Sequence, residues 1–433
     1  MVQKNGTNLS GKDLLAAYQE CRSLTEELSA PLSAEDQTVQ SMPDASPTKW
    51  HRGHTSWFFE TLVLAAEFSN YKVYEPSYMY LFNSYYESLG ARYPRSERGL
   101  ITRPSAKEIG KYRQYVDGAM IDFFESSLTD ENKKIIELGI QHEQQHQELL
   151  LMDIKHALSL NPMSPSYLCA NAVEPSSSDK NEIPVTTQWI ESEGGLVEIG
   201  SEGDEFSFDN ERPRHSVHLV PFALSNRLVS CGDWIEFIQD GGYRRPELWL
   251  SDGWAEINER KLEAPLYWSR PDRRGVSLDS LDSEWEIFTL SGQRKLNRST
   301  PVCHVSYFEA DAFARWAGCR LPTEAEWETT ASQYPLTGNF LDQSRLDPSP
   351  YSPSFGFFGD VWQWTSSSYC PYPKFQPAKG ALGEYNGKFM VNQYVLRGGS
   401  CVTPRGHIRR TYRNFFPAGA RWAFAGVRLA RDL

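Results

Sequence analysis

The stretch that decides the fold of the N-terminal part is IIELGIQHEQQHQELLLMDIKHAL, residues 135–158. It contains no proline, and apolar residues along it can supply a buried stripe, which predicts one long helix. These residues are Ile136, Leu138, Ile140, Leu149, Leu150, Ile154 and Leu158. His142 and His146 are four residues apart, so the helix places both imidazoles on one face, about one turn apart. On a single helix, this is the spacing that two histidines need in order to bind one metal ion.

Segments upstream of this stretch also have a helical character. Apolar side chains fall at helical spacing between residues 14 and 28, and the segment Trp57–Phe68 is apolar and aromatic. Together with the long helix, these helical segments joined by loops predict an up-and-down four-helix bundle in roughly the first 160 residues. Metal sites in bundles are commonly built from side chains on facing helices.

The composition changes after Leu160. Residues 161–187 are rich in proline and serine, which is typical of a linker. Beyond them, glycine, proline and tryptophan are frequent, and we expect two short helices, at Cys231–Gln239 and Tyr307–Trp316. The sequence therefore predicts an α+β multidomain chain, with a helical bundle at 1–165, a linker at 166–187 and a second domain at 188–433.

The length, net charge and cysteine content of the sequence limit the classes of protein to which it can belong. The 433 residues are too many for one ordinary core, and the net charge of -12 argues against nonspecific nucleic-acid binding. No apolar stretch approaches the roughly 20 residues that span a bilayer, and residues 1–14 lack the apolar region of a signal peptide. Seven scattered cysteines without a CxxC pair fit reduced thiols. We expect a cytoplasmic protein, and the sequence leaves its oligomeric state open.

A reactive metal site needs a third ligand besides His142 and His146. His51 and His54, in Trp50-His51-Arg52-Gly53-His54, offer it from the start of another predicted helix. The string HEQQH also satisfies the H-E-x-x-H signature of zinc proteases, with Glu143 as general base. The longer metzincin signature would need Gly at Leu149 and His at Met152, so we rank the protease interpretation low.

The pattern H-x-x-x-H-x-E (His142, His146, Glu148), together with W-H-x-G-H upstream, resembles the ergothioneine-biosynthesis sulfoxide synthase (hercynine oxygenase) family. The resemblance implies a DinB-like four-helix bundle that holds Fe²⁺ through His54, His142 and His146. It leaves His51 and Glu148 outside the ligand set, as supporting or structural residues. Three imidazoles leave open positions for a thiolate, an imidazole nitrogen and O2. Zn or Ni at such a site stays possible.

The C-terminal half carries a second resemblance. Its motifs resemble the formylglycine-generating-enzyme (sulfatase-modifying factor) fold, a variant of the C-type-lectin-like scaffold. They are VEIGS (197–201), DNERP (209–213), DGGY (240–243), LPTEAEWE (321–328), GDVWQWT (359–365), RGGS (397–400) and GVR (426–428). We interpret nearly all of them as scaffold, with glycines in turns and Glu–Arg pairs inside. The copper-binding cysteines of those enzymes align here with Thr403 and Ile408, which argues against their oxidase activity.

The family resemblance also suggests residues for the oxygen and thiol sides of the reaction. Tyr85 and Tyr86 match a tyrosine pair of one subgroup, and a phenol can supply a proton on the oxygen side. In another subgroup a tyrosine of the C-terminal domain has that role. Arg95 and Arg98 fall at the spacing of the family's thiol-binding arginines, and guanidinium groups suit a substrate carboxylate.

Four residues are expected at the imidazole substrate, which in the family is hercynine. Gln145 precedes the second helix ligand, and Asn414 matches a residue near the betaine end, where Phe415 and Phe416 can face the trimethylammonium group. Some relatives have Trp-Asp in place of this Phe pair and bind a γ-glutamyl thiol, so its absence here favours free cysteine. The alternatives are a selenosugar donor, a Zn-dependent DinB-like thiol transferase, and a nonenzymatic lectin-like module.

Overall fold

The computed structural model describes residues 10–68, 70–126, 128–168, 186–270, 285–350, 356–378 and 380–433. These residues form two compact units. The first runs to Asn161 and also includes Glu202–Phe206 and Pro377–Gly387, and the second holds the remainder. Most of the predicted linker, residues 169–185, lies outside the described residues. We retain the division at 165 and 187 as a proposal.

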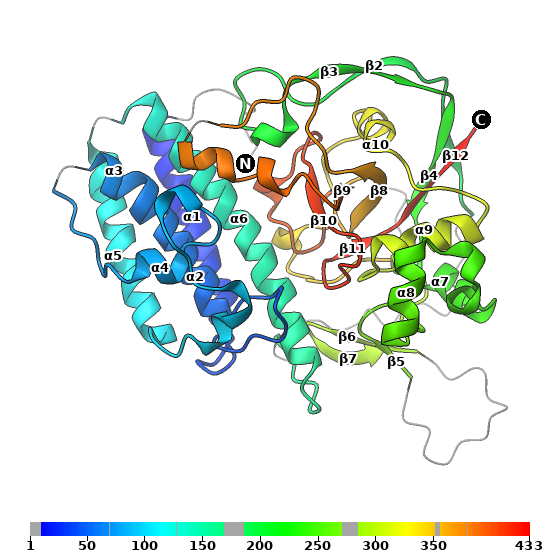
Figure 1. The fold of residues 1–433 in the computed structure, drawn as a ribbon, viewed down its shortest axis with the longest axis horizontal. Coiled ribbons are helices and arrows are strands. Elements are labelled where there is room, and N and C mark those ends of the chain that lie inside the picture. Colours follow the sequence, from blue (N-terminus) through cyan, green and yellow to red (C-terminus); the bar gives the residue numbers. More distant parts are fainter. Residues whose placement is uncertain are drawn as a thin grey trace. The chain divides into compact units, whose positions relative to one another are not determined.

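The first unit is helical (Figure 1). Its long helices are α1 (Gly11–Ser29), α2 (Thr48–Phe59), α5 (Ala106–Glu125) and α6 (Asp130–Ser159). A π-helical turn (Glu60–Leu64) and α3 (Ala65–Glu67) continue α2, and α4 (Tyr78–Phe82) follows. Two 3-10 turns, Glu87–Leu89 and Arg95–Leu100, lead to α5. The helical segment expected at 57–68 therefore begins earlier, at Thr48, and includes both upstream histidines.

Local sequence explains where the helices start. The Ser105 and Thr129 side chains accept hydrogen bonds from the main-chain N–H groups of Glu108 and Asn132, and so cap α5 and α6. Helix α2 follows Pro47 and packs against α5 and α6, and all its residues are buried. Gly139 allows α6 to approach α2 closely, because an added Cβ would lie 2.5 Å from the Phe59 ring. This close contact brings polar side chains of α2 and α6 together inside the unit.

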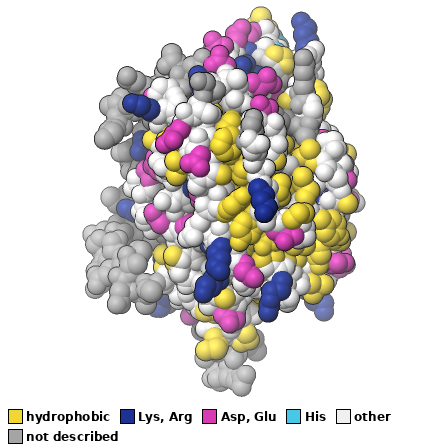
Figure 2. All heavy atoms as spheres, turned by 90° about the vertical axis from the view of Figure 1, so that its left-hand side faces the viewer, with side chains coloured by type: hydrophobic (Ala, Val, Ile, Leu, Met, Phe, Trp, Pro, Cys, Tyr) yellow, Lys and Arg dark blue, Asp and Glu magenta, His cyan; other side chains and the backbone are white. Residues whose placement is uncertain are grey.

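The surface of the first unit also carries hydrophobic groups. Figure 2 shows hydrophobic side chains gathered on the face that it presents. The large exposed hydrophobic residues of this unit include Val73, Tyr74, Met79, Tyr80, Tyr115 and Ile121. None of the helices in the described ranges is long and apolar enough to cross a membrane.

The second unit is built from short, mainly antiparallel sheets. One has the order β1-β4-β12 (Trp189–Ser192, Phe222–Leu228, Arg428–Asp432), so strands from both ends of the unit flank its middle strand. Another has the order β10-β9-β8-β11 (Asn414–Pro417, Gln393–Arg397, Trp362–Ser368, Ala425–Gly426), with β11 parallel to β8. The hairpin β2-β3 (Gly195–Ile199, His215–Leu219) and the sheet β5-β6-β7 (Trp268–Ser269, Glu286–Thr289, Gly292–Lys295) complete the set.

The expected helices Cys231–Gln239 (α7) and Tyr307–Trp316 (α9) are confirmed at those bounds. Two further short helices, α8 (Ser251–Arg260) and α10 (Glu324–Ala331), were not among those expected. Helix α10 buries glutamates together with apolar residues, so it lacks the apolar stripe that predicts a helix. Its Glu324 accepts a hydrogen bond of 2.8 Å from Arg413, and Glu328 is paired with Arg397. The motif carboxylates therefore form internal ion pairs, as the scaffold interpretation predicts.

Candidate metal centre

Three histidines from two packed helices face one another in the first unit. His54 lies on α2, and His142 and His146 lie on α6. Their candidate ligand nitrogens all lie within 4.8 Å of one another, and the Nε2 atoms of His54 and His142 are 3.1 Å apart. Within the described part of the chain, no other group of three His, Cys, Asp or Glu side chains is gathered in this way. This arrangement can hold one metal ion.

The environment of the cluster keeps its imidazoles neutral. Burial lowers the pKa of His54 and His146 well below 6.5, and the neighbouring His142 lowers both further. Burial lowers the pKa of His142 itself to about 3. Neutral imidazoles offer a lone pair each, and they suit Fe, Zn, Cu or Ni better than Mg or Ca. The donor set therefore fits a transition metal.

His54 is fixed by one main-chain contact and two stacked tryptophan rings. Its Nδ1 lies 2.6 Å from the main-chain oxygen of Phe82. A carbonyl only accepts, so Nδ1 carries the proton and the lone pair is on Nε2, which faces His142. The Trp50 and Trp57 rings stack on His54 at 4.6 Å and 5.6 Å, nearly parallel to it. The ring can hardly turn without displacing them.

The fourth histidine of the two motifs, His51, lies beside the cluster rather than in it. Its Nδ1 is 2.8 Å from Nδ1 of His146. Glu148 is buried on α6 and is not part of the gathered group. The structure thus brings together the three residues expected as ligands and leaves His51 and Glu148 outside them.

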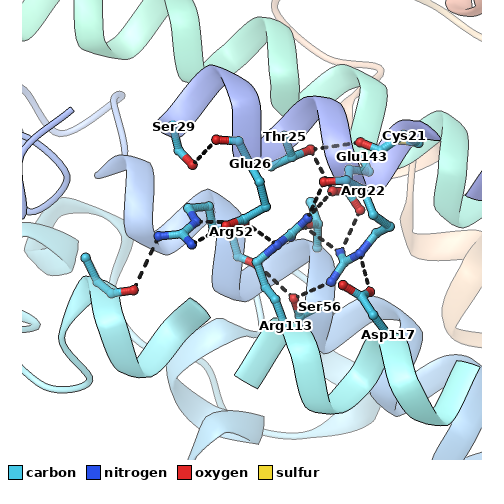
Figure 3. A network of polar contacts seen from close by, with 12 residues as sticks. Cys21, Arg22, Thr25, Glu26, Ser29, Arg52, Ser56, Arg113, Asp117 and Glu143 are labelled. Carbon is cyan, nitrogen blue, oxygen red and sulfur yellow. Dashed lines mark hydrogen bonds and ion pairs between the residues drawn. The ribbon is translucent and has the colours of Figure 1, made fainter. Parts of the chain in front are cut away.

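Glu143, the residue a zinc protease would use as general base, belongs to a buried ion network (Figure 3). Its carboxylate accepts hydrogen bonds from Arg22 at 2.7 Å, Arg113 at 2.9 Å and Thr25 at 2.6 Å. The two guanidinium groups and these bonds hold its pKa at about 2, although burial alone would raise it. A base must be able to take up a proton near pH 7. This environment argues against the protease interpretation.

The Tyr85-Tyr86 pair lies between α4 and the next 3-10 turn. The two rings are 4.7 Å apart, and Tyr86 packs against Trp57 at 5.6 Å. Tyr86 is buried, and burial raises its pKa, whereas Tyr85 is half-buried. The pair is therefore connected to the cluster through the Trp57 ring that stacks on His54.

Sequence reasoning missed a third tyrosine at this site. Tyr385 belongs to Pro377–Gly387, the late segment that clusters with the first unit. Its ring lies 5.6 Å from the His142 ring and 5.9 Å from Tyr85, and its hydroxyl donates to the side-chain oxygen of Gln145. Nothing local in the sequence distinguishes Tyr385 from the other tyrosines. Its place at the site becomes apparent only because the segment Pro377–Gly387 packs with the helical unit.

The two arginines expected at the thiol occupy different environments. Arg98 is buried, lies 3.3 Å above the Trp50 ring, and donates to the Ser46 and Ser84 hydroxyls at 2.9 Å and 3.2 Å. Its Nε has no hydrogen-bond partner among the described residues. Arg95 is exposed and donates to the main-chain oxygen of Asp44. Arg98 alone of the two is linked to the cluster, through the Trp50 ring on His54.

The remaining substrate candidates belong to strand β10 of the second unit. Phe415 stacks on Tyr369 at 4.0 Å, and Phe416 meets Trp422 edge-on at 5.7 Å. The Asn414 side-chain oxygen accepts a hydrogen bond from the Phe415 main-chain N–H. Phe415 and Phe416 are successive residues of β10, so their rings point to opposite faces of the sheet and pack on different partners. Each ring offers an aromatic face of the type that binds a quaternary ammonium group, but the strand does not bring the two faces together.

Comparison with known families defines the class of protein first. Residues 174–354 and 353–433 match the model of the sulfatase-modifying factor enzyme 1-like domain. The protein is thus one in which such a domain follows a helical unit that carries a histidine cluster able to hold a metal ion. The match confirms the predicted α+β class.

Comparison with individual proteins is more specific. A hercynine oxygenase of Mycobacterium tuberculosis is 30% identical over 79% of this chain and 81% of its own length. Another, from Mycolicibacterium thermoresistibile, is 28% identical over 90% and 88%. Ergothioneine biosynthesis protein 1 of Schizosaccharomyces pombe is 26% identical over 70% of this chain and 40% of its own length. The chain belongs to the hercynine oxygenase family.

Proposed function

We propose that the protein is an O2-dependent, non-haem Fe²⁺ sulfoxide synthase that joins the sulfur of cysteine to the imidazole of hercynine. The observation that carries the proposal is the cluster of His54, His142 and His146 in a member of the hercynine oxygenase family. Kinship with a protein named for ergothioneine biosynthesis supports the same pathway. The reaction is that of an oxygenase acting on small molecules.

The overall reaction balances without an external reductant. The thiol S–H and an imidazole C–H bond break, a C–S bond forms, and sulfur gains one oxygen atom. The other oxygen atom leaves as water with the two released protons, so O2 takes up the four electrons given by thiol and imidazole. Fe²⁺ held by the three histidines would supply the redox chemistry with O2 that this coupling requires.

The residues of the chain then have to deliver a proton on the oxygen side. Tyr385, Tyr85 and Tyr86 are the candidate phenols, and Tyr385 has the ring in contact with a ligand histidine. Its hydroxyl is already oriented by Gln145. A phenol in this position can donate a proton at its Oη atom. We therefore add Tyr385 to the Tyr85-Tyr86 pair as a proposed donor.

The substrate assignments complete the proposal. We assign Arg95 and Arg98 to the carboxylate of free cysteine, and Gln145 to the imidazole of hercynine. Asn414, Phe415 and Phe416 are assigned to the betaine end. The described cysteines are free thiols, which suits a reducing compartment, and we place the protein in the cytoplasm.

The test begins with metal analysis after anaerobic purification. Stoichiometric iron, and O2 consumption that requires both hercynine and cysteine, are the expected results. Zinc or nickel with thiol transfer in the absence of O2 would instead support the DinB-like transferase. Turnover only with a selenosugar would support the selenium alternative, and no turnover at all would support the nonenzymatic module.

A further inference from the structure

A short chain of polar contacts leads away from His146 into the helical unit. Nδ1 of His146 lies 2.8 Å from Nδ1 of His51, and Nε2 of His51 lies 3.1 Å from Oδ2 of Asp153. The same Oδ2 accepts a hydrogen bond of 2.7 Å from the main-chain N–H of Ser46, just before α2. His51 and Asp153 are 2% and 5% exposed, so water cannot readily replace any of these partners.

The proton positions along this chain follow from the acceptor at its end. Oδ2 of Asp153 already accepts from the Ser46 main-chain N–H, and Nε2 of His51 is placed to donate to the same oxygen. With Nε2 of His51 donating to Asp153, Nδ1 of His51 is the acceptor for Nδ1 of His146, 2.8 Å away. This leaves the lone pair of His146 on Nε2. The carboxylate of Asp153 thus selects, through His51, the nitrogen with which His146 can bind a metal.

The three ligand histidines are supported in different ways. The outer nitrogen of His54 is bound to a main-chain carbonyl, and that of His142 has no hydrogen-bond partner among the described residues. Among the described residues, the outer nitrogen of His146 alone is connected to a carboxylate, through the ring of His51 to Oδ2 of Asp153. Such outer contacts orient the ring and raise the basicity of the ligand.

We infer that His51 and Asp153 are positioning residues that hold His146 in its metal-binding tautomer and so set the metal affinity of the site. The inference rests on the proposed metal-binding function. Asp153 is seven residues after His146, two turns further along the same face of α6, and His51 lies on α2. The contact chain therefore also fixes the ligand on α6 relative to the helix that carries His54.

The test uses two substitutions of His51 that differ in polarity but not greatly in size. In His51→Gln, the amide oxygen can accept from His146 and the amide N–H can donate to Asp153, which reproduces both contacts. His51→Leu fills a similar volume and makes neither contact. The control is His156→Asn, on the same helix but outside the gathered histidine group, where Nδ1 of His156 lies 2.7 Å from the Ser41 hydroxyl.

The measurement is the dissociation constant of Co²⁺ for the metal-free, full-length protein, by competition with a chelator, together with its melting temperature. We expect His51→Leu to weaken Co²⁺ binding about 10- to 100-fold, and His51→Gln and His156→Asn to stay close to the parent. Asp153→Asn should also weaken Co²⁺ binding. In the double variant it should add little to the effect of His51→Leu, because both substitutions break the same series of polar contacts.

Equal affinities of the Leu and Gln variants, whether at the parent value or equally weakened, would overturn the inference. Additive effects of the His51 and Asp153 substitutions would overturn it as well. These outcomes differ from failure of the proposed function. A parent protein that binds no Co²⁺, or binds it equally well after His54→Ala, refutes the metal site itself.

Discussion

The Tyr385 hydroxyl donates a hydrogen bond to the side-chain oxygen of Gln145, 240 residues earlier in the sequence and adjacent to His146. The bond connects the late segment Pro377–Gly387 to the helix that carries two of the candidate metal ligands. It also joins a proposed proton donor, Tyr385, to Gln145, the residue that we assign to the imidazole substrate. Substitutions at Tyr385 and Gln145 should therefore affect the chemistry more than the fold.

The first prediction concerns the metal ligands. His54→Ala, His142→Ala or His146→Ala should each abolish iron retention and sulfoxide formation, because two imidazoles hold the ion too weakly. Iron content after anaerobic desalting and product formation are the measurements, with His156→Asn as control. Full iron occupancy in His54→Ala together with its loss in His51→Ala would mean that the third ligand is wrongly assigned.

The second prediction concerns the phenols. Removing the proton donor should let oxygen attack the sulfur directly, so the product should shift from sulfoxide toward cysteine sulfinate. We expect this shift in Tyr385→Phe and in the double variant Tyr85→Phe/Tyr86→Phe, since Phe keeps the aromatic packing while removing the hydroxyl. Product ratios by mass spectrometry, at unchanged iron content, decide it. A variant that makes sulfoxide at the parent rate and ratio shows that its tyrosine is structural.

The third prediction concerns the thiol. Free cysteine should have a higher kcat/KM than γ-glutamylcysteine, because Phe415 and Phe416 provide no charge for a γ-glutamyl group. Arg98→Lys should raise KM for cysteine, since a lysine cannot keep the fork of contacts to Ser46 and Ser84. A clear preference for γ-glutamylcysteine would contradict this assignment.

The fourth prediction concerns the buried network around Glu143. Glu143→Gln leaves Arg22 and Arg113 without their shared carboxylate, so it should lower the free energy of unfolding by about 3–5 kcal/mol. The exposed Glu125→Gln is the matched control and should change it little. Urea denaturation of the metal-free proteins measures both. Unchanged stability with complete loss of activity would instead favour a catalytic role for Glu143.

The same network sets a dependence on pH. The pKa of Glu143 is about 2 in the folded protein, below the usual value of 4.5. Its stabilising contribution is therefore complete above pH 4.5 and is lost as the pH falls from there toward 2. The stability difference between the parent and Glu143→Gln should shrink over that interval. A difference that stays constant down to pH 2.5 would show that the pKa of Glu143 in the folded protein is not lowered from its usual value.

Local pattern was sufficient for much of the fold. The bounds of α7 and α9 follow from apolar spacing between a serine cap and the end of the stripe. Helix α10 was not predictable in this way, because its buried glutamates are neutralised by arginines more than sixty residues downstream. Sequence patterns treat charged residues as exposed, so they do not indicate a helix whose charged side chains are buried in ion pairs.

The sequence by itself determined what depends on helical geometry: two imidazoles four residues apart share one face, wherever their helix lies. The tertiary structure decided what depends on which surfaces meet. It placed His54 among the gathered nitrogens and His51 behind His146, although only three residues separate them on α2. It also turned Glu143 toward Arg22 and Arg113, and brought Tyr385 to Gln145. Contacts between distant segments arise from the packing of whole elements, and no local spacing encodes them.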